Sequence, residues 1–348
     1  MTDQHGGNIY AAPCELDFSA NINPLGTPPG VIEAACEGVR RSTAYPDPQA
    51  GVLRDAIAAK HGLQRERVIC GNGAAELIFL VCDALRPKKA LLLSPCFSEY
   101  ERALCKVCCE TVFYPCPAEE GFVPGPDYET YLTSDTDIAF LCIPNNPTGA
   151  MMSRSRLLRI ADLCERNRIF LVMDECFVPL TDAGEANSLS DLVMDHPHLF
   201  ILRAFTKLYA MPGLRLGYGL SADEQLLKKM RGCSQPWNVS LPAQMAGVAA
   251  LRETDFEERS RSLITQEKAR LLRELQRLGL TCFKPGANFI FFRGPETLGE
   301  QCLKRGILIR DCSHFRGLQK GYWRVAVRSH EENARLIEVL VAIVTIVD

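Results

Sequence analysis

The feature that most constrains the fold is a regular alternation of short apolar runs with longer helical patterns between residue 31 and about residue 233. Runs such as LLLS, IAFLCI and FLVMD are continuously apolar, as expected for strands that are covered on both faces. The segments between them include Ala74–Leu85 and Arg154–Arg168, which have helical patterns. The alternation predicts an α/β fold with a mostly parallel, seven-stranded sheet and helices on both faces. The expected strands are Val68–Cys70, Ala90–Ser94, Thr111–Tyr114, Ile138–Ile143, Phe170–Asp174, Phe200–Arg203 and Leu216–Leu220.

The sequence pattern changes after Pro236. The stretch from Ala243 to Leu278 predicts one or two helices that end at Gly279. Short strands separated by Gly and Pro follow, and then a terminal helix over His330–Val344, which together predict a smaller α+β domain. The first 30 residues are rich in Asn, Pro and Gly and predict an extended arm. We therefore expect an N-terminal arm (residues 1–30), a large domain (residues 31–236) and a small C-terminal domain (residues 237–348).

Composition excludes several kinds of partner. Lys plus Arg number 39 and Asp plus Glu number 42 in 348 residues, so no basic field attracts nucleic acid or an anionic membrane. No apolar run reaches about 18 residues, and the start of the chain lacks the pattern of a signal peptide. We therefore expect a cytoplasmic protein whose 16 cysteines are mostly reduced. No second ligand pair follows Cys105, Cys108 and Cys109, so we expect small buried side chains there and no metal.

Polar motifs occur where four of the predicted strands end. GNGAAE follows Cys70, PNNPTG follows Ile143, DE follows Met173, and TK follows Phe205. The carboxyl ends of strands in an open α/β sheet meet at one crevice, where ligands bind. Each motif alone has a plainer interpretation as a turn, a helix cap, a salt bridge or a solvated lysine. Their common position favours one ligand site assembled from several strand ends.

The residue types in these motifs suit an anionic ligand with a cationic ring. The small residues of GNGAAE allow the backbone at a helix N-terminus to approach an anion. Asn146 can donate its amide to a ligand oxygen, and Asp174 can hold a cationic ring nitrogen. Lys207 in a partly dry pocket can act as an amine nucleophile, and the guanidinium of Arg215 suits a phosphate.

Together these motifs resemble those of fold-type I enzymes that use pyridoxal 5′-phosphate, in the aminotransferase class I/II superfamily. PNNPTG, the VMDE strand end and TKLYAMPGLRLGY stand in the family's order and at its spacings. The resemblance implies that Lys207 binds the coenzyme covalently and that Asp174 pairs with its ring nitrogen. It also implies further coenzyme contacts, namely Gly73, Ala74, Ala75, Thr206 and Arg215 around the phosphate, Phe97 on the ring and Asn146 on the 3′-oxygen.

Two residues depart from the family's usual pattern. Ala204 stands where a Ser or Thr usually contacts the coenzyme phosphate, a role in which Thr206 could partly substitute. Phe177 stands where many aminotransferases have a tyrosine that bonds the 3′-oxygen. Neither change removes an essential group. The intact set of Lys207, Asp174 and Arg215 argues against the alternative of a catalytically idle protein that only binds a partner.

Two branches of the superfamily are suggested by shorter motifs. AYPDPQ and DFSANINPLG resemble the histidinol-phosphate aminotransferases, which implies a homodimer in which Tyr45 reaches the neighbouring subunit's coenzyme phosphate. HGGN at His5–Asn8 and YWRVAVRSHEEN resemble the L-threonine O-3-phosphate decarboxylases of cobalamin synthesis. We therefore expect decarboxylation of a small phosphorylated amino acid, L-threonine O-3-phosphate. The alternatives are a histidinol-phosphate-type aminotransferase and a decarboxylase of L-serine O-phosphate.

Arginines of the C-terminal part carry the expectation for the substrate. The resemblance implies that Arg324 binds a carboxylate and that Arg310 holds a phosphate, with Arg328 as a further candidate. Each arginine alone could equally form a surface salt bridge. The full set of expected substrate-binding residues is His5, Asn8, Asn23, Asn146, Arg310, Arg324 and Arg328.

Overall fold

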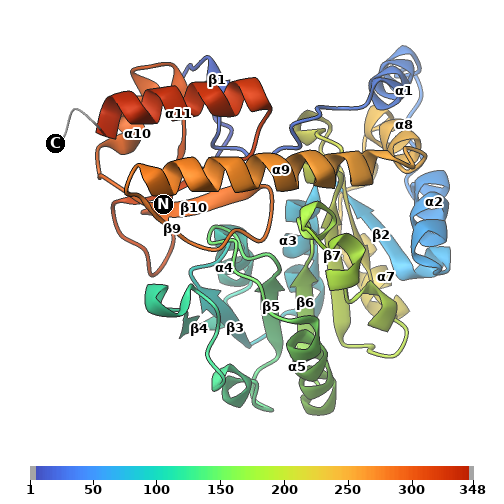
Figure 1. Cartoon of the computed structure of the whole chain (residues 1–348). Helices are drawn as coiled ribbons and strands as arrows, with labels where there is room; N and C mark the ends of the chain where they lie inside the picture. Colours follow the sequence, from blue (N-terminus) through green and yellow to red (C-terminus); the bar gives the residue numbers. More distant parts are fainter. Residues whose placement is uncertain (1–4, 345–348) are drawn as a thin grey trace.

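A computed structural model describes residues 5–344 of the chain. Its central sheet has seven strands in the order β2-β8-β7-β6-β5-β3-β4 (Figure 1). Only β8 runs antiparallel to its neighbours, β2 and β7, so the predicted mostly parallel sheet is confirmed. The strands are β2 (Val68–Gly71), β3 (Lys89–Ser94), β4 (Glu110–Pro115), β5 (Ile138–Cys142), β6 (Phe170–Asp174), β7 (Leu199–Ala204) and β8 (Gly217–Leu220).

Both faces of the central sheet are buried, which explains the continuous apolar runs. In β3, Leu91 and Leu93 pack into one core, whereas Ala90 and Leu92 pack into a second core on the other face. Helix α5 (Arg154–Asn167) contributes to the first core and α3 (Ala74–Leu85) to the second. Helices therefore cover both faces, as the alternation predicts.

The predicted helices are found close to their expected positions. Helix α3 covers Ala74–Leu85 and α11 covers His330–Val344, as expected. The long stretch after Pro236 forms two helices, α8 (Leu241–Ala250) and α9 (Phe256–Arg277). The remaining α-helices are α1 (Pro29–Arg40), α2 (Gly51–His61), α4 (Ser98–Lys106), α6 (Phe205–Leu208), α7 (Glu224–Cys233) and α10 (Leu298–Leu303).

The C-terminal part contains a second, antiparallel sheet in the order β12-β13-β10-β9. Apolar side chains of β10, β13, α9 and α11 form a third core beneath it. The N-terminal arm joins this part, because β1 pairs with β11 in parallel. The bounds of these strands are β1 (Leu16–Asp17), β9 (Thr281–Cys282), β10 (Phe289–Arg293), β11 (Ile307–Leu308), β12 (Arg310–Asp311) and β13 (Tyr322–Ala326).

Helices α8 and α9 connect the two parts of the molecule. Helix α9 lies across the molecule from the second sheet towards α8, and α8 packs against α1 (Figure 1). The division into an arm and two domains, with boundaries near residues 30 and 236, stays a prediction. Within residues 5–344, no helix combines the length and apolar character needed to cross a lipid bilayer.

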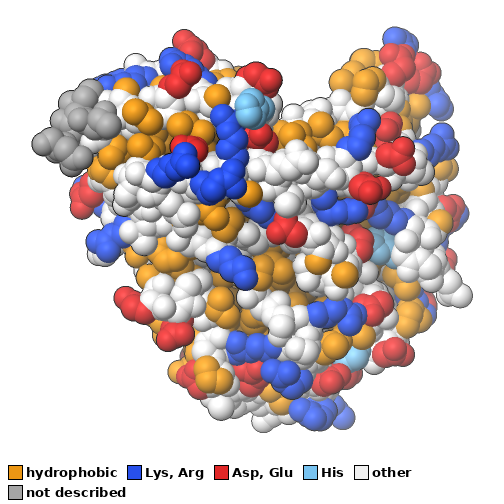
Figure 2. Space-filling model, in the orientation of Figure 1, with side chains coloured by type: hydrophobic (Ala, Val, Ile, Leu, Met, Phe, Trp, Pro, Cys, Tyr) orange, Lys and Arg blue, Asp and Glu red, His pale blue; other side chains and the backbone are white. Residues whose placement is uncertain are grey.

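The surface and the cysteines agree with the composition. Acidic and basic side chains are interspersed on the face in Figure 2, in keeping with a net charge of −3. All sixteen cysteines are free thiols. Cys109 is buried, but Cys105 and Cys108 are exposed, so the expectation of three buried thiols is wrong for these two. Cys105 lies within α4 but is not among its buried residues, and Cys108 lies beyond the end of α4, in a turn with φ of 58°.

Candidate active site

The expected lysine and aspartate come from neighbouring strand ends. Asp174 is the last residue of β6, and Lys207 lies in α6, which directly follows β7. Strands β6 and β7 are adjacent and parallel, with Asp174 opposite Leu202. The two side chains therefore start from the same carboxyl edge of the sheet, where the sequence predicts the site.

The amine of Lys207 lies in a half-buried position among aromatic and cationic groups. Its Nζ is 5.5 Å from the centre of the Phe177 ring, and Phe177 packs on Phe289 at 5.3 Å. Burial and the nearby charge of Arg324 lower the pKa of Lys207 to about 8. Near neutral pH the amine is therefore neutral and nucleophilic far more often than an ordinary lysine amine.

The carboxylate of Asp174 is buried and held by two hydrogen bonds. The hydroxyl of Tyr100 donates to Oδ2 at 2.6 Å, and the backbone N–H of Cys176 donates to Oδ1 at 3.0 Å. Burial, followed by the charge of Asp174, raises the pKa of Tyr100 well above its usual value, so its hydroxyl remains a donor. Sequence reasoning missed Tyr100. Its position three residues after Phe97 is the signal that could have found it.

The start of α3 forms a concave site that fits an anion. Gly73 precedes the first helical residues, Ala74 and Ala75, with φ of 81° and no side chain that caps the helix. A Cβ atom on Gly73 would collide with the guanidinium of Arg215, and one on Gly217 would collide with the backbone N of Ala74. The glycines thus allow an exposed guanidinium to lie beside free helix N–H groups, which together bind phosphate well.

An aromatic side chain and a hydroxyl group lie on the elements next to Asp174 and Lys207. Phe97 packs edge-on against Tyr100, with ring centres 5.6 Å apart, at the start of α4. Thr206 is buried immediately before Lys207 in α6, and Ala204 provides no hydroxyl at the end of β7.

The two asparagines of PNNPTG have different roles. Asn145 is buried and shapes the turn, because its Nδ2 donates to Pro95 O at 3.0 Å and to Thr148 Oγ1 at 2.9 Å. Asn146 instead points its Oδ1 at Arg324, which donates a hydrogen bond to it. The turn interpretation therefore applies to Asn145, while Asn146 links the large sheet to the C-terminal part.

Arg324 is a buried cation, and only some of its hydrogen-bond donors have partners. Its Nη2 donates to Ser19 O at 2.9 Å, and Nη1 donates to Asn146, but its Nε has no partner within residues 5–344. Burial, and to a smaller degree the charge of Arg310, lowers the pKa of Arg324 to about 10. A buried donor without a partner indicates a place for a ligand oxygen.

Arg310 lies directly opposite Arg324 in the pairing of β12 with β13. It is half-buried above the ring of Phe315, at 5.5 Å, and burial lowers its pKa. Two like charges on facing positions repel each other, so an anion between them would be favoured. Arg328 is different, because it pairs with Glu332 at 2.6 and 2.9 Å, the structural salt bridge that the sequence left open.

The HGGN segment lies against the site through His5. Nε2 of His5 is 3.0 Å from Oε1 of the buried Glu99, and its ring centre is 6.2 Å from that of Phe97. Burial opposes the ionisation of Glu99, but the contacts with His5 and Arg102 outweigh it and lower its pKa. His5 therefore stands beside the aromatic ring expected to cover the coenzyme.

The glycines of this segment allow close packing on the arm. A Cβ on Gly6 would collide with Ser19 O, and Gly7 N donates to Ser19 Oγ at 2.7 Å. Ser19 in turn accepts from Arg324. Asn8 is exposed, and its Oδ1 accepts from the backbone of Ala11 at 3.2 Å, so it shapes a turn.

Asn23 contacts the backbone of α6. Its Nδ2 donates to Leu208 O at 2.6 Å and to Ser260 Oγ at 2.7 Å, and its Oδ1 accepts from Leu25 N at 3.1 Å. Its backbone N also donates to Lys207 O at 3.2 Å. All the polar groups of its side chain are therefore occupied by protein atoms.

Tyr45 lies on the surface of its own chain. Its side chain is 78% exposed and stacks on Trp237, with ring centres 4.4 Å apart. It borders a groove of about 780 Å³ between α1, the start of α2 and α8.

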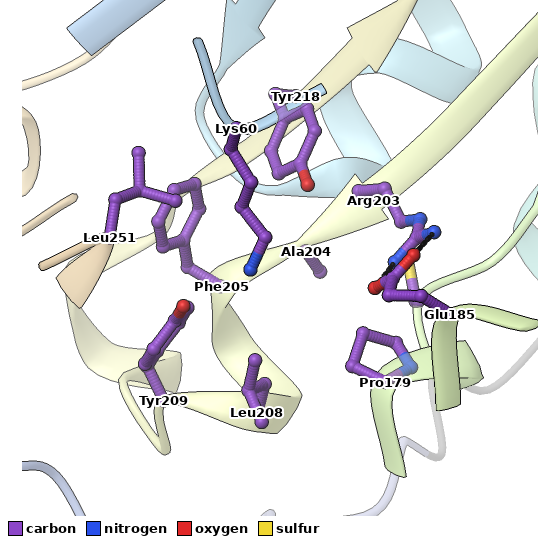
Figure 3. Close-up of a pocket in the computed structure, with 11 residues that line it drawn as sticks. Lys60, Pro179, Glu185, Arg203, Ala204, Phe205, Leu208, Tyr209, Tyr218 and Leu251 are labelled. Atoms are coloured by element: carbon purple, nitrogen blue, oxygen red, sulfur yellow. Dashed lines mark hydrogen bonds and ion pairs between the residues drawn. The ribbon is translucent and has the colours of Figure 1, made fainter. Parts of the chain in front are cut away.

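A separate small cavity of about 20 Å³ lies behind α6. Lys60, Arg203 and Tyr218 line it together with Ala204 and Leu208, and the Lys60 amine points into it (Figure 3). A cavity of this size holds about one water molecule, so it is no place for a coenzyme.

Comparisons with known proteins agree with this geometry. Residues 14–340 match the family model for aminotransferase class I and II. The threonine-phosphate decarboxylase of Salmonella typhimurium is 36% identical over 98% of this chain and 96% of its own. An adenosylcobalamin biosynthesis bifunctional protein of Leptospira interrogans is 31% identical over 96% of this chain and 40% of its own. The crystal structure of the histidinol-phosphate aminotransferase from Clostridium acetobutylicum superposes with a TM-score of 0.88 at 30% identity, covering 95% of this chain and 99% of that one.

Proposed function

Because the chain belongs to the aminotransferase class I and II family, whose enzymes depend on pyridoxal 5′-phosphate, we propose that it is a threonine-phosphate decarboxylase. It would convert L-threonine O-3-phosphate to (R)-1-aminopropan-2-yl phosphate and carbon dioxide in cobalamin biosynthesis. The observation that carries this choice is the 36% identity, over 98% of the chain, to a threonine-phosphate decarboxylase. A cytoplasmic location stays a prediction.

The residues at the site fit the coenzyme. Gly73 leaves a space beside Arg215 that a side chain would fill, and the adjoining helix N-terminus is uncapped. Lys207 offers an amine of lowered pKa for the aldehyde, and Asp174 offers a buried carboxylate for the ring nitrogen. The remaining contacts would come from Phe97 on the ring, Asn146 on the 3′-oxygen, and Ala74, Ala75 and Thr206 on the phosphate.

Asp174 and Lys207 would have different roles in the reaction. When bound, pyridoxal 5′-phosphate supplies a ring that accepts the electron pair released at the substrate's α-carbon. Asp174, fixed by Tyr100 and the N–H of Cys176, would hold a proton on the ring nitrogen. Lys207, with a pKa of about 8, would hold a proton and give it to the α-carbon at the position that the departing carboxylate leaves.

The two facing arginines, Arg310 and Arg324, would determine the orientation of the bound substrate. Arg324 already donates to Asn146 and Ser19, so only part of its hydrogen-bonding capacity remains for a carboxylate. Within residues 5–344 the guanidinium of Arg310 donates no hydrogen bond, so it would take the phosphate. A loosely held carboxylate and a firmly held phosphate favour loss of the carboxylate as carbon dioxide.

We also propose a homodimer in which Tyr45 reaches the coenzyme phosphate of the partner subunit. Val52, which lines the same groove as Tyr45, is 71% exposed, and Val39 and Ile32 of α1 are 60% and 51% exposed. An exposed apolar surface of this kind is typical of a protein interface.

A histidinol-phosphate-type aminotransferase is the second candidate, because the Clostridium acetobutylicum structure superposes so closely. The test is to incubate the protein and coenzyme with O-phosphothreonine and measure released carbon dioxide without added keto acid. We expect release from O-phosphothreonine, slower release from O-phosphoserine, and none with K207A. Transfer of the amino group of histidinol phosphate to 2-oxoglutarate, with no carbon dioxide from O-phosphothreonine, would overturn the proposal.

A further inference from the structure

A buried ion pair joins the two strand ends that carry Asp174 and Lys207. Glu175 directly follows Asp174, and Arg203 is the penultimate residue of β7, four residues before Lys207. Oε2 of Glu175 lies 2.8 Å from Nη2 of Arg203 and 3.1 Å from its Nε. The two side chains are only 1% and 3% exposed. The pair therefore connects the backbone beside Asp174 with the backbone that enters α6.

A loop closes over this pair from the other side. Arg203 donates to both carboxylate oxygens of Glu185, at 2.7 and 2.9 Å, as the dashed lines of Figure 3 show. Ser188 Oγ donates to Glu175 at 2.7 Å, and the backbone N of Leu189 donates to its other oxygen at 2.7 Å. Both members of the pair are thus held in one orientation by several hydrogen bonds.

A contribution to folding stability does not by itself explain why a charged pair, Glu175 and Arg203, is buried here. Removing two charges from water is expensive, and well-packed apolar side chains often stabilise a core equally well. Burial raises the pKa of Glu175 despite the opposing charge of Arg203, which shows the penalty for this carboxylate. What the ion pair offers over an apolar contact is a fixed direction, because the guanidinium fork accepts few orientations of its partner.

The helix that carries Lys207 needs such an external support. Helix α6 has only four residues, and a single helical turn is not stable by its own hydrogen bonds. Asn23 holds its end, through contacts to the backbone of Lys207 and Leu208. Its beginning follows directly from the strand end that Arg203 fixes.

We propose that Arg203 and Glu175 are positioning residues, which hold the amine of Lys207 at a set place relative to the carboxylate of Asp174. The inference depends on the proposed function only in that Lys207 binds the coenzyme. It concerns the protein without coenzyme or substrate, so its failure is distinguishable from failure of the decarboxylase assignment.

The test measures the titration of Lys207 in the coenzyme-free protein. The protein is labelled with an amine reagent at a series of pH values, and mass spectrometry gives the extent of labelling at Lys207. The groups that face this amine are Arg324, Arg215, Asp174 and Cys176, and none is altered. In R203Q we expect the labelling midpoint to rise from about 8 towards the ordinary lysine value of about 10.4, because a loosened α6 exposes the amine to water.

The matched control is R156Q. Arg156 forms a comparable two-pronged pair with Glu129, at 2.8 and 3.0 Å, but it lies at the start of α5. Its other hydrogen bonds go to the backbone of Pro124 and Gly125, which belong to neither β6 nor β7. Urea unfolding measures the stability of both variants. We expect a similar loss of stability in R156Q with an unchanged Lys207 midpoint.

Two milder variants keep the test decisive if R203Q does not fold. R203K retains the charge without the fork, and E185Q weakens only the more exposed side of Arg203. We expect a partial rise of the Lys207 midpoint in each, and a fall in kcat of the holoenzyme with little change in KM. If these variants lose stability while Lys207 titrates as in the wild type, the pair is purely structural and the inference is overturned.

Discussion

Arg310 and Arg324 occupy directly opposite positions on β12 and β13, so their side chains leave the same face of the C-terminal sheet. Of the two guanidinium groups, only that of Arg324 donates hydrogen bonds within residues 5–344, to Asn146 and Ser19. Facing charges of one sign are unfavourable unless an anion separates them. This pair is therefore a place where binding of an anion would relieve repulsion.

The first prediction concerns Arg310. Its replacement by glutamine removes charge-assisted hydrogen bonds worth about 1.5–3 kcal/mol, so KM for O-phosphothreonine should rise about 10- to 100-fold. R328Q is the control, because Arg328 is already paired with Glu332, and we expect little change in KM. Steady-state kinetics compare the two variants. An equal rise in both would contradict the division of roles.

The second prediction concerns the start of α3. In G73A the new methyl group would push Arg215 away from the helix N-terminus, so the affinity for pyridoxal 5′-phosphate should fall at least about 10-fold. G62A is the control, because Gly62 has a positive φ of 64° but open space around it. Fluorescence titration of the apoprotein with coenzyme measures the Kd. The same loss in G62A would mean that backbone strain, not the anion site, is responsible.

The third prediction concerns Tyr100. Y100F leaves Oδ2 of Asp174 buried without its donor, which should lower the free energy of unfolding by about 1–3 kcal/mol and reduce kcat. Y128F offers a matched control, since the hydroxyl of Tyr128 is fully buried with no hydrogen-bond partner among the described residues. Its removal should leave both quantities nearly unchanged. If Y100F changed neither the free energy of unfolding nor kcat, Asp174 would not depend on this donor.

The fourth prediction is a pH dependence of stability in the coenzyme-free protein. The folded pKa of Lys207 is about 8, whereas the unfolded chain has the ordinary value of about 10.4. Between these values the unfolded state binds more protons, so Lys207 makes the free energy of unfolding rise with pH from about 8 to about 10. Urea unfolding of wild type and K207M should show this difference in slope. Parallel curves for the two proteins would refute it.

The fifth prediction concerns Asn23, which the sequence favours as a substrate ligand. Because its amide is fully occupied by Leu208, Ser260 and Leu25, N23A should destabilise the coenzyme-free protein by about 1–3 kcal/mol. N8A should be close to neutral, since Asn8 is exposed. Thermal unfolding of both apoproteins provides the measurement. An N23A protein of normal stability with a raised KM would instead support a direct contact to substrate.

The sheet was accessible from sequence because its pattern is local. Strands covered on both faces read as unbroken apolar runs, and β6 begins and ends where FLVMD predicts. Helix α3 likewise follows from a glycine turn and a long apolar face. Asp174 and Lys207 were accessible because each directly follows such a run.

Long-range partners were not accessible, because they depend on which elements lie side by side. Nothing near Glu175 in the sequence indicates that Arg203, 28 residues away, neutralises it. Asn23 meets Ser260 across 237 residues, which only the packing of α9 brings about. From the sequence, Arg328 could bind a substrate or pair with a neighbouring carboxylate equally well. Only the structure, with Glu332 at 2.6 Å, shows that it forms an ion pair within the protein.

The arm has a mechanical consequence. Its strand β1 is fastened to β11, and Ser19 to Arg324, whereas Asn23 is fastened to the turn that carries Lys207. If the C-terminal sheet swings relative to the central one, Ser19 must travel with it while Asn23 stays behind. The bending then falls on the three residues between them, so that residues 20–22 would act as the joint of any such opening.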